Sequence, residues 1–229
     1  MSRQVAIIGA GNAGTLHMLL AKQLGAKSED IVMLDVDRNR LDYLGKHDLF
    51  DGQTVVFDKE DTDEDLGDNK DQFDVVIVVP TVITSKTLNV ASQLVVREGG
   101  YIHLYGGTRQ DSNFAGVNID PIRREERKET VTVNEKSVSF SGAYGADSAN
   151  FQKAFTLLQE SGFANARELV STKITLAELP AYIMAMAKGD EDPPGKVVVM
   201  LTYASKENDI IALVSKVTKL SRVDNGIVA

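Results

Sequence analysis

Three glycines near the N-terminus have the spacing of a turn that binds a diphosphate. Gly9, Gly11 and Gly14 follow a short apolar run and precede a helical pattern of leucines. We expect Gly9 to permit a tight turn, Gly11 to let the backbone approach a ligand, and Gly14 to bring the helix close to the strand. The N–H groups at Asn12 and Ala13 and the positive end of the helix dipole favour a diphosphate there. These residues predict a dinucleotide site.

An acidic residue stands where the second strand of such a unit should end. Asp35 lies about twenty residues beyond Gly14, the distance at which a ribose-binding acid follows a dinucleotide turn. Its carboxylate can accept hydrogen bonds from the adenosine ribose and would repel a 2′-phosphate, which favours NAD over NADP. Arg38 and Arg40 leave NADP open as the less favoured cofactor, because either guanidinium could offset that repulsion.

Two further glycine pairs follow predicted strands. Gly106 and Gly107 end a strand at residues 101–105, at the sheet edge where such folds place ligands, so their backbone could meet the nicotinamide end of a cofactor. Gly142 and Gly145 follow a later strand in the same way. A plain turn at the end of a strand explains either pair equally well.

Residues with the chemistry of catalysis are scarce in this chain. It has no cysteine and three histidines, His17, His47 and His103. We expect His17, on a helix, and His103, inside an apolar strand, to be packing residues. No histidine and carboxylate have the spacing of metal ligands, and without cysteine there is no thiol nucleophile. The sequence therefore predicts a cofactor site with neither a catalytic residue nor zinc in this chain.

Strand and helix patterns alternate through the first 145 residues. This alternation predicts right-handed strand–helix–strand units, and hence an α/β fold with a Rossmann-type, doubly wound parallel sheet. A polar stretch before the last strand is expected to hold only a short helix around residues 123–128. The predicted strands lie at residues 5–8, 30–35, 54–57, 74–79, 101–105 and 138–141.

The pattern changes after Gly145. Helices are expected at residues 149–158 and 176–188, a buried strand at 196–201, and a weak helix at 208–220. We therefore divide the chain into three parts, the last two being a C-terminal α+β segment of an incomplete second domain and an extension. The dinucleotide-binding domain comprises residues 1–145, the C-terminal segment comprises residues 146–203, and the extension comprises residues 204–229.

Composition excludes several classes of partner. The 229 residues include 25 basic and 33 acidic side chains, a net charge of −8 that disfavours nucleic acid and anionic membrane surfaces. Most of the excess lies between residues 58 and 72, which we interpret as a solvated connection. No apolar run has the length of a membrane span and no signal peptide is evident, so a cytoplasmic protein is expected.

Several segments resemble the cofactor half of medium-chain, zinc-type alcohol and polyol dehydrogenases. They include residues 9–14 (Gly-Ala-Gly-Asn-Ala-Gly), 33–35 (Met-Leu-Asp) and 195–198 (Gly-Lys-Val-Val), and the similarity extends to about Tyr203. Sorbose-phosphate reductases and sorbitol dehydrogenases are the suspected nearest relatives. The resemblance implies hydride transfer between a nicotinamide cofactor and an alcohol, polyol or sugar phosphate.

The resemblance also implies roles for particular residues. Asp35 and Arg40 would contact the adenosine ribose, Pro80 would line the cofactor cleft, and Lys196 would approach the pyrophosphate. Residues 146–203 match the segment that returns to the catalytic domain in that family.

The family's zinc-bearing N-terminal domain has no counterpart in this sequence. We therefore expect a missing catalytic domain, a separate subunit, or a homodimer built in part from the strand at Val138. An NAD(H)-binding regulatory or redox-sensing module without its own catalysis is the alternative function.

Overall fold

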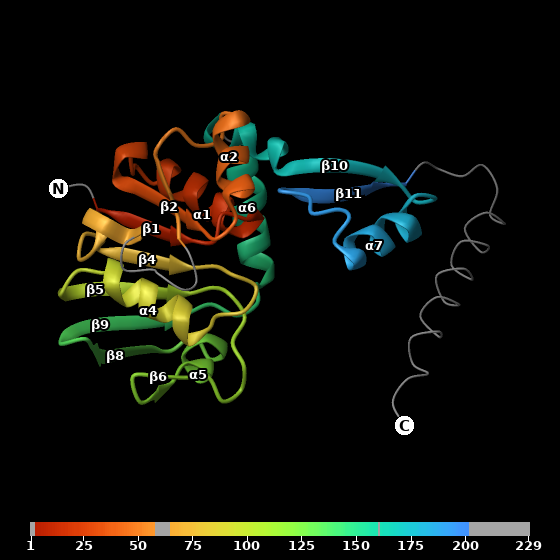
Figure 1. The fold of residues 1–229 in the computed structure, drawn as a ribbon. Coiled ribbons are helices and arrows are strands. Elements are labelled where there is room, and N and C mark those ends of the chain that lie inside the picture. Colours follow the sequence, from red (N-terminus) through yellow and green to blue (C-terminus); the bar gives the residue numbers. More distant parts are fainter. Residues whose placement is uncertain (1–2, 58–64, 160, 202–229) are drawn as a thin grey trace, which may run out of the picture. The chain divides into compact units, whose positions relative to one another are not determined.

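The computed structural model describes residues 3–57, 65–159 and 161–201 (Figure 1). The chain divides into two compact units. The first unit ends at Leu169 and the second begins at Val170.

A seven-stranded sheet forms the centre of the first unit, in the order β3-β2-β1-β4-β5-β9-β8. All neighbouring strands pair in parallel except β8, which is antiparallel to β9. Every residue of β1 and β2 is buried, as expected of central parallel strands covered on both faces. The predicted α/β, doubly wound class is confirmed. The strands are β1 (Val5–Ile8), β2 (Ile31–Asp35), β3 (Gln53–Val56), β4 (Val75–Val78), β5 (Glu98–Leu104), β8 (Lys128–Val133) and β9 (Lys136–Gly142).

Helices cover the sheet on both faces. Buried side chains of α1 and α2 belong to one apolar core, with Ile7 and Met33, while those of α4 and α5 belong to a second core on the opposite face, with Ile8 and Leu34. Ile7 and Ile8 therefore point to different faces, as the period of a strand requires. The helices are α1 (Asn12–Gln23), α2 (Arg38–Lys46), α4 (Ser85–Leu94), α5 (Ile119–Arg124) and α6 (Ser148–Leu158), with 3-10 segments at Ser28–Asp30, Gly67–Asn69 and Ser161–Leu169.

The polar stretch before β9 differs from the sequence prediction. The short helix ends at Arg124, and the following residues form β8, a strand that the sequence did not indicate. β8 and β9 are joined by Asn134 and Glu135, both with positive φ (49° and 63°), as a two-residue hairpin loop requires. Asparagine followed by glutamate is a weaker hairpin signal than asparagine followed by glycine, which explains the omission.

The hairpin also corrects the predicted dimer edge. Val138 lies in β9, which pairs with β5 on one side and β8 on the other. Its side chain is fully buried, so the strand at Val138 does not offer a free edge. The outer strand on this side of the sheet is β8.

The second unit contains two parallel strands connected by a helix. β10 (Val170–Thr175) pairs with β11 (Lys196–Met200), and α7 (Leu179–Lys188) lies between them in the chain. The strand at 196–201 and the helix at 176–188 were expected, whereas β10 was not. The prediction that the strand at 196–201 is buried is wrong, because every residue of β11 is half-buried or exposed. Ile183, Met184 and Met186 on α7 are exposed. The helix predicted at residues 208–220 lies outside the described residues.

Membrane-spanning helices are absent from the part of the chain that the structure describes, since none of its helices combines the necessary length and apolarity.

Candidate functional site

The turn between β1 and α1 requires two of its three glycines for steric reasons. Gly9 has a φ of +108°, a conformation that other residues rarely adopt. A Cβ added to Gly14 would lie 1.8 Å from the carbonyl oxygen of Gly9. Gly14 therefore lets α1 begin in direct contact with the turn that precedes it.

Gly11 has a different environment. A Cβ added there would meet no atom within 4 Å, so the space beside it is open. Gly11 occupies the N-cap position of α1, and no side chain caps this helix. In contrast, side chains that accept a hydrogen bond from a first-turn N–H group cap α2, α4, α5 and α6. These side chains are Asp37, Thr84, Asn118 and Asp147.

The open N-terminus of α1 is suited to an anion. N–H groups in the first turn of a helix have no partner within the helix, and here no side chain replaces one. The helix dipole adds partial positive charge at the same point. The side-chain oxygen of Asn12, Oδ1, is buried and has no hydrogen-bond partner among the described residues. A ligand donor would satisfy it, so both polar features fit a bound dinucleotide.

Asp35 holds the glycine turn to the end of β2. Its Oδ2 accepts a hydrogen bond from the N–H of Ala10 at 2.6 Å, and its Oδ1 accepts one from the N–H of Asp37 at 3.0 Å. The residue is only 5% exposed. Each carboxylate oxygen retains a second lone pair, so these bonds leave capacity for a ribose hydroxyl. The sequence indicated the acid but not its bond to the turn.

The arginines that follow Asp35 differ in their surroundings. The Nε atom of Arg40 lies 3.5 Å from Oδ2 of Asp37, which caps α2 by accepting from the N–H of Asn39. Arg38, the first residue of α2, is exposed. Arg40 is therefore partly neutralised by Asp37.

The carboxyl ends of β1, β4 and β5 bring Gly9, Pro80 and Gly106 together. A Cβ on Gly9 would lie 3.3 Å from the Pro80 nitrogen, and a Cβ on Gly106 would lie 2.1 Å from the Pro80 carbonyl oxygen. The strands β2 and β3 lie on one side of β1, and the next strand in the chain, β4, lies on its other side. The strand order therefore reverses at β1, and the carboxyl end of β1 is the topological switch point of the sheet. Open α/β sheets bind ligands at such points.

A group of histidine and hydroxyl side chains lies between α1 and β5. The ring of His17 packs edge-on against Tyr105, with centroids 4.6 Å apart, and His103 Nδ1 lies 2.9 Å from Oγ of Ser141. Burial lowers the pKa of both histidines, and the charge of His17 lowers that of His103 further. Burial therefore favours the neutral form of both rings. Among the described residues, no cluster of three potential metal ligands is found.

The remaining predicted residues lie elsewhere. Gly142 packs against Arg123, whose Cα would be 2.2 Å from an added Cβ, so packing accounts for this glycine. Gly145 has a φ of +82° in the segment before α6. Lys196 is the first residue of β11 in the second unit, where it is exposed, and its role at a pyrophosphate stays a prediction.

Comparison with known proteins identifies similar folds. No family model and no curated protein matches the chain. Among solved structures, L-idonate 5-dehydrogenase from Escherichia coli has a TM-score of 0.61 and 24% identity, over 88% of this chain and 51% of that chain. The 2R,3R-butanediol dehydrogenase from Bacillus subtilis has a TM-score of 0.59 and 19% identity, over 88% and 51%.

A third similar structure contains a cofactor. It is an Escherichia coli protein described as a short chain alcohol dehydrogenase complexed with NADH, with a TM-score of 0.62 and 15% identity, over 88% of this chain and 52% of that chain. The chain thus spans about half the length of these proteins. The predicted fold resemblance to medium-chain alcohol and polyol dehydrogenases is confirmed for that half.

Proposed function

We propose that this chain is the NAD-binding portion of an oxidoreductase that transfers a hydride between a nicotinamide cofactor and an alcohol, polyol or sugar phosphate. The open N-terminus of α1 carries the proposal, because it has the glycine turn, the unsatisfied N–H groups and the dipole of a diphosphate site. The similar structures are alcohol and polyol dehydrogenases, one with NADH, which supports this reaction class.

Each residue of the turn has its own role in this proposal. The N–H groups of Gly11, Asn12, Ala13 and Gly14 would bind the pyrophosphate, since no side chain competes for them. Gly11 leaves room for the phosphate oxygens. When bound, the cofactor supplies a nicotinamide ring that accepts or donates the hydride.

We assign NAD rather than NADP to the site. The Asp35 carboxylate, held by Ala10 and Asp37, would accept a ribose hydroxyl on its remaining lone pairs and would repel a 2′-phosphate. Arg40 would contact the ribose while its charge is offset by Asp37. Pro80 and Gly106, at the ends of β4 and β5, would line the cleft towards the nicotinamide.

We further propose that the residues that bind the substrate and the zinc ion lie in polypeptide outside residues 1–229. This polypeptide would be another domain, a separate subunit or a partner copy. The chain spans about half of its structural relatives, which supports this division. In this proposal residues 1–145 bind the cofactor, residues 146–203 belong to the catalytic domain, and residues 204–229 are an extension. The exposed apolar side chains of α7 are compatible with a partner.

Isothermal titration with NADH and NADPH tests the proposal, using Gly11→Asp and a control. An aspartate at the N-cap would accept hydrogen bonds from first-turn N–H groups, so it should stabilise the protein by a few tenths of a kcal/mol relative to glycine. Its charge would exclude the pyrophosphate, so NADH binding should weaken at least tenfold. Gly45→Ala, in α2 with open space around its Cβ, should also stabilise the protein and leave binding unchanged.

Three outcomes would overturn parts of this proposal. Undiminished NADH binding by Gly11→Asp would exclude the α1 site, and tighter binding of NADPH than NADH would exclude the NAD assignment. The third outcome concerns catalysis, which is tested by measuring NAD reduction when alcohols and sugar phosphates are added to the chain in native extract. Binding without any turnover there would favour the regulatory module.

A further inference from the structure

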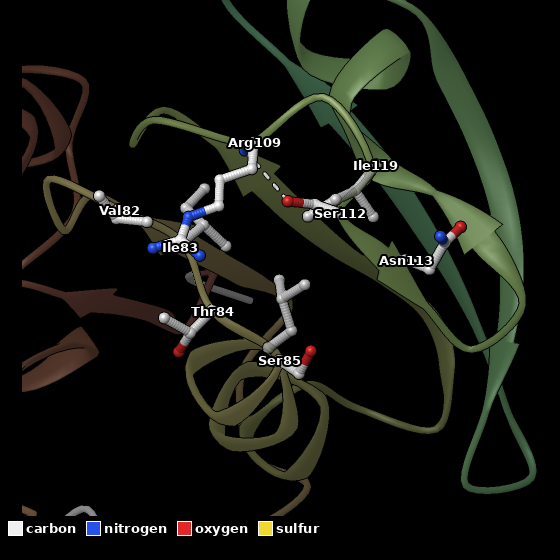
Figure 2. A pocket seen from close by; sticks show the side chains of 9 residues that line it. Val82, Ile83, Thr84, Ser85, Arg109, Ser112, Asn113 and Ile119 are labelled. Carbon is white, nitrogen blue, oxygen red and sulfur yellow. Dashed lines mark hydrogen bonds between the residues drawn. The ribbon is translucent and has the colours of Figure 1, made fainter. Parts of the chain in front are cut away.

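A pocket of about 250 Å³ opens beside the carboxyl ends of β4 and β5, outside the glycine turn (Figure 2). Its floor is apolar and consists of Ile83, Leu88 and Ile119, each at most 3% exposed, while the exposed Val82 also lines the pocket. Polar side chains surround this floor. They come from the first turn of α4, the loop after β5 and the hairpin formed by β6 (Asn113–Phe114) and β7 (Val117–Asn118), and they are Thr84, Ser85, Arg109, Ser112 and Asn113.

The electrostatic character of the pocket is positive. Figure 2 shows the Arg109 side chain extended from the loop after β5 towards the segment 82–84. Of the described residues that line the pocket, none is acidic, so the guanidinium has no counter-charge inside it. The ten-residue helix α4 begins at Ser85 in the pocket wall, and its dipole adds partial positive charge at the same end.

Hydrogen bonds fix the loop that carries Arg109. The Arg109 N–H donates to Oγ of Ser112 at 3.0 Å, the Ser112 N–H donates to the Arg109 carbonyl at 3.0 Å, and the Ile119 N–H donates to the Ser112 carbonyl at 2.9 Å. The opposite wall is attached to the strand end, because the Ile83 N–H donates to the carbonyl of Gly107 at 2.7 Å. The backbone of the pocket walls is therefore held in place without a ligand, which lowers the entropic cost of binding.

From these features we infer that the pocket binds a small organic carboxylate with a short apolar body. The guanidinium and the hydroxyl groups around it would bind the carboxylate, since arginine forms two parallel hydrogen bonds to that group. The floor would receive the apolar body. One arginine over an apolar floor matches a monoanion better than a phosphate dianion, which would leave charge unpaired. The volume lies below the range of about 300–1,000 Å³ for larger ligands, so the guest is small.

The residues that line this pocket differ from those of the proposed cofactor site. None of the residues of the glycine turn lines the pocket, and neither Asp35 nor Arg40 does. The pocket and the proposed cofactor cleft adjoin at Ile83, since a Cβ on Gly106 would lie 3.0 Å from its side chain. Gly11→Asp, which changes the glycine turn alone, is expected to lose NADH binding and to retain carboxylate binding.

Amide NMR of the full chain with isovalerate as the probe tests this inference, and isovaleramide, of the same shape but uncharged, is the matched ligand. Saturable shifts confined to residues 82–88 and 109–119 are expected with isovalerate. Arg109→Gln should weaken this binding at least tenfold, as removal of a charged hydrogen-bond partner does. Arg127→Gln, which removes an exposed arginine paired with Glu125 outside the pocket, should bind like the wild type.

Each contrary result would overturn the inference. Equal binding of isovaleramide would exclude recognition of charge, and unaltered binding by Arg109→Gln would exclude the arginine. Shifts centred on residues 9–14 would place the anion at the glycine turn. Tighter binding of inorganic phosphate than of isovalerate would exclude a carboxylate as the guest.

Discussion

The Asp35 carboxylate accepts a hydrogen bond from the N–H of Ala10 at 2.6 Å, and thereby joins the end of β2 to the turn after β1. The same side chain accepts from the N–H of Asp37. The residue proposed to bind the ribose is therefore also the residue that positions the phosphate turn, so its substitution should affect stability and cofactor choice together.

Asp35→Asn should separate these two effects. An amide can accept from only one of the two N–H groups and would face the other with its own NH₂ group, which should cost about 1–3 kcal/mol of unfolding free energy. Removal of the negative charge should also raise the affinity for NADPH relative to NADH. Asp37→Asn is the control for the effect on stability, since asparagine caps a helix as well as aspartate does. Equal urea midpoints for Asp35→Asn and wild type would contradict the account.

Gly14→Ala should prevent the contact between α1 and the turn. The added Cβ would lie 1.8 Å from the Gly9 carbonyl oxygen, and the atoms involved are backbone atoms that cannot rotate away. Overpacking of this kind should cost about 3 kcal/mol. Gly45→Ala, which adds the same group in open space, should not destabilise the protein. Thermal melts that rank the two alanine variants in the opposite order would disprove the role of Gly14.

Lys136 stabilises the end of α4 from the neighbouring strand β9. Its Nζ donates to the carbonyls of Ser92 at 2.6 Å and Val95 at 3.1 Å, and also pairs with the Asp71 carboxylate. Lys136→Met would remove the Lys136 donor from both carbonyls and leave Asp71 with Arg97 as its partner, which should cost about 3 kcal/mol. Lys136→Arg serves as the comparison because it retains the charge in a larger side chain.

The pair with Lys136 also predicts a pH dependence. The hydrogen bond from Lys136 lowers the pKa of Asp71, so the pair contributes stability above the unfolded pKa of 3.8 and loses it as pH falls through the folded value. The stability difference between wild type and Lys136→Met should be constant above about pH 5 and shrink below it. Chemical denaturation at a series of pH values measures this, and a difference that grows in acid would refute the prediction.

The two buried histidines predict a separate effect at milder acidity. Burial lowers the pKa of His17 and His103 below the unfolded value of 6.5, so the unfolded chain binds more protons as pH falls below that value. Stability should therefore decline below about pH 6.5. His17→Asn should flatten this decline, whereas His47→Asn, outside the group, should preserve it. Histidine ring signals from NMR titration would locate the groups directly.

The sequence predicted the parts of the site that depend on local pattern. Gly9, Gly14 and Asp35 follow from short runs whose backbone demands are visible in the residue types, and the parallel strands follow from apolar runs such as β4. Contacts between distant segments were not predictable. The bond from Ala10 to Asp35 depends on how two strands meet at the sheet edge.

Other omissions have similar causes. The hairpin at Asn134 lacks the usual glycine, and β10 has little apolar alternation, with one buried side chain among six residues. The strand at Val138 was predicted to contribute to a dimer interface because β8 was not predicted. β8 pairs with that strand and occupies its outer side. The pocket at Arg109 could not be predicted, because its walls come from four separate segments.

In the proposed function, the cofactor takes the place of the side-chain cap that α1 lacks. No side chain caps this first turn, while α2, α4, α5 and α6 supply their own acceptors. Cofactor present at about one hundred times its dissociation constant adds roughly 2.7 kcal/mol to the folded state. If the proposed site binds the cofactor, the melting temperature of the protein becomes a gauge of how much cofactor surrounds it.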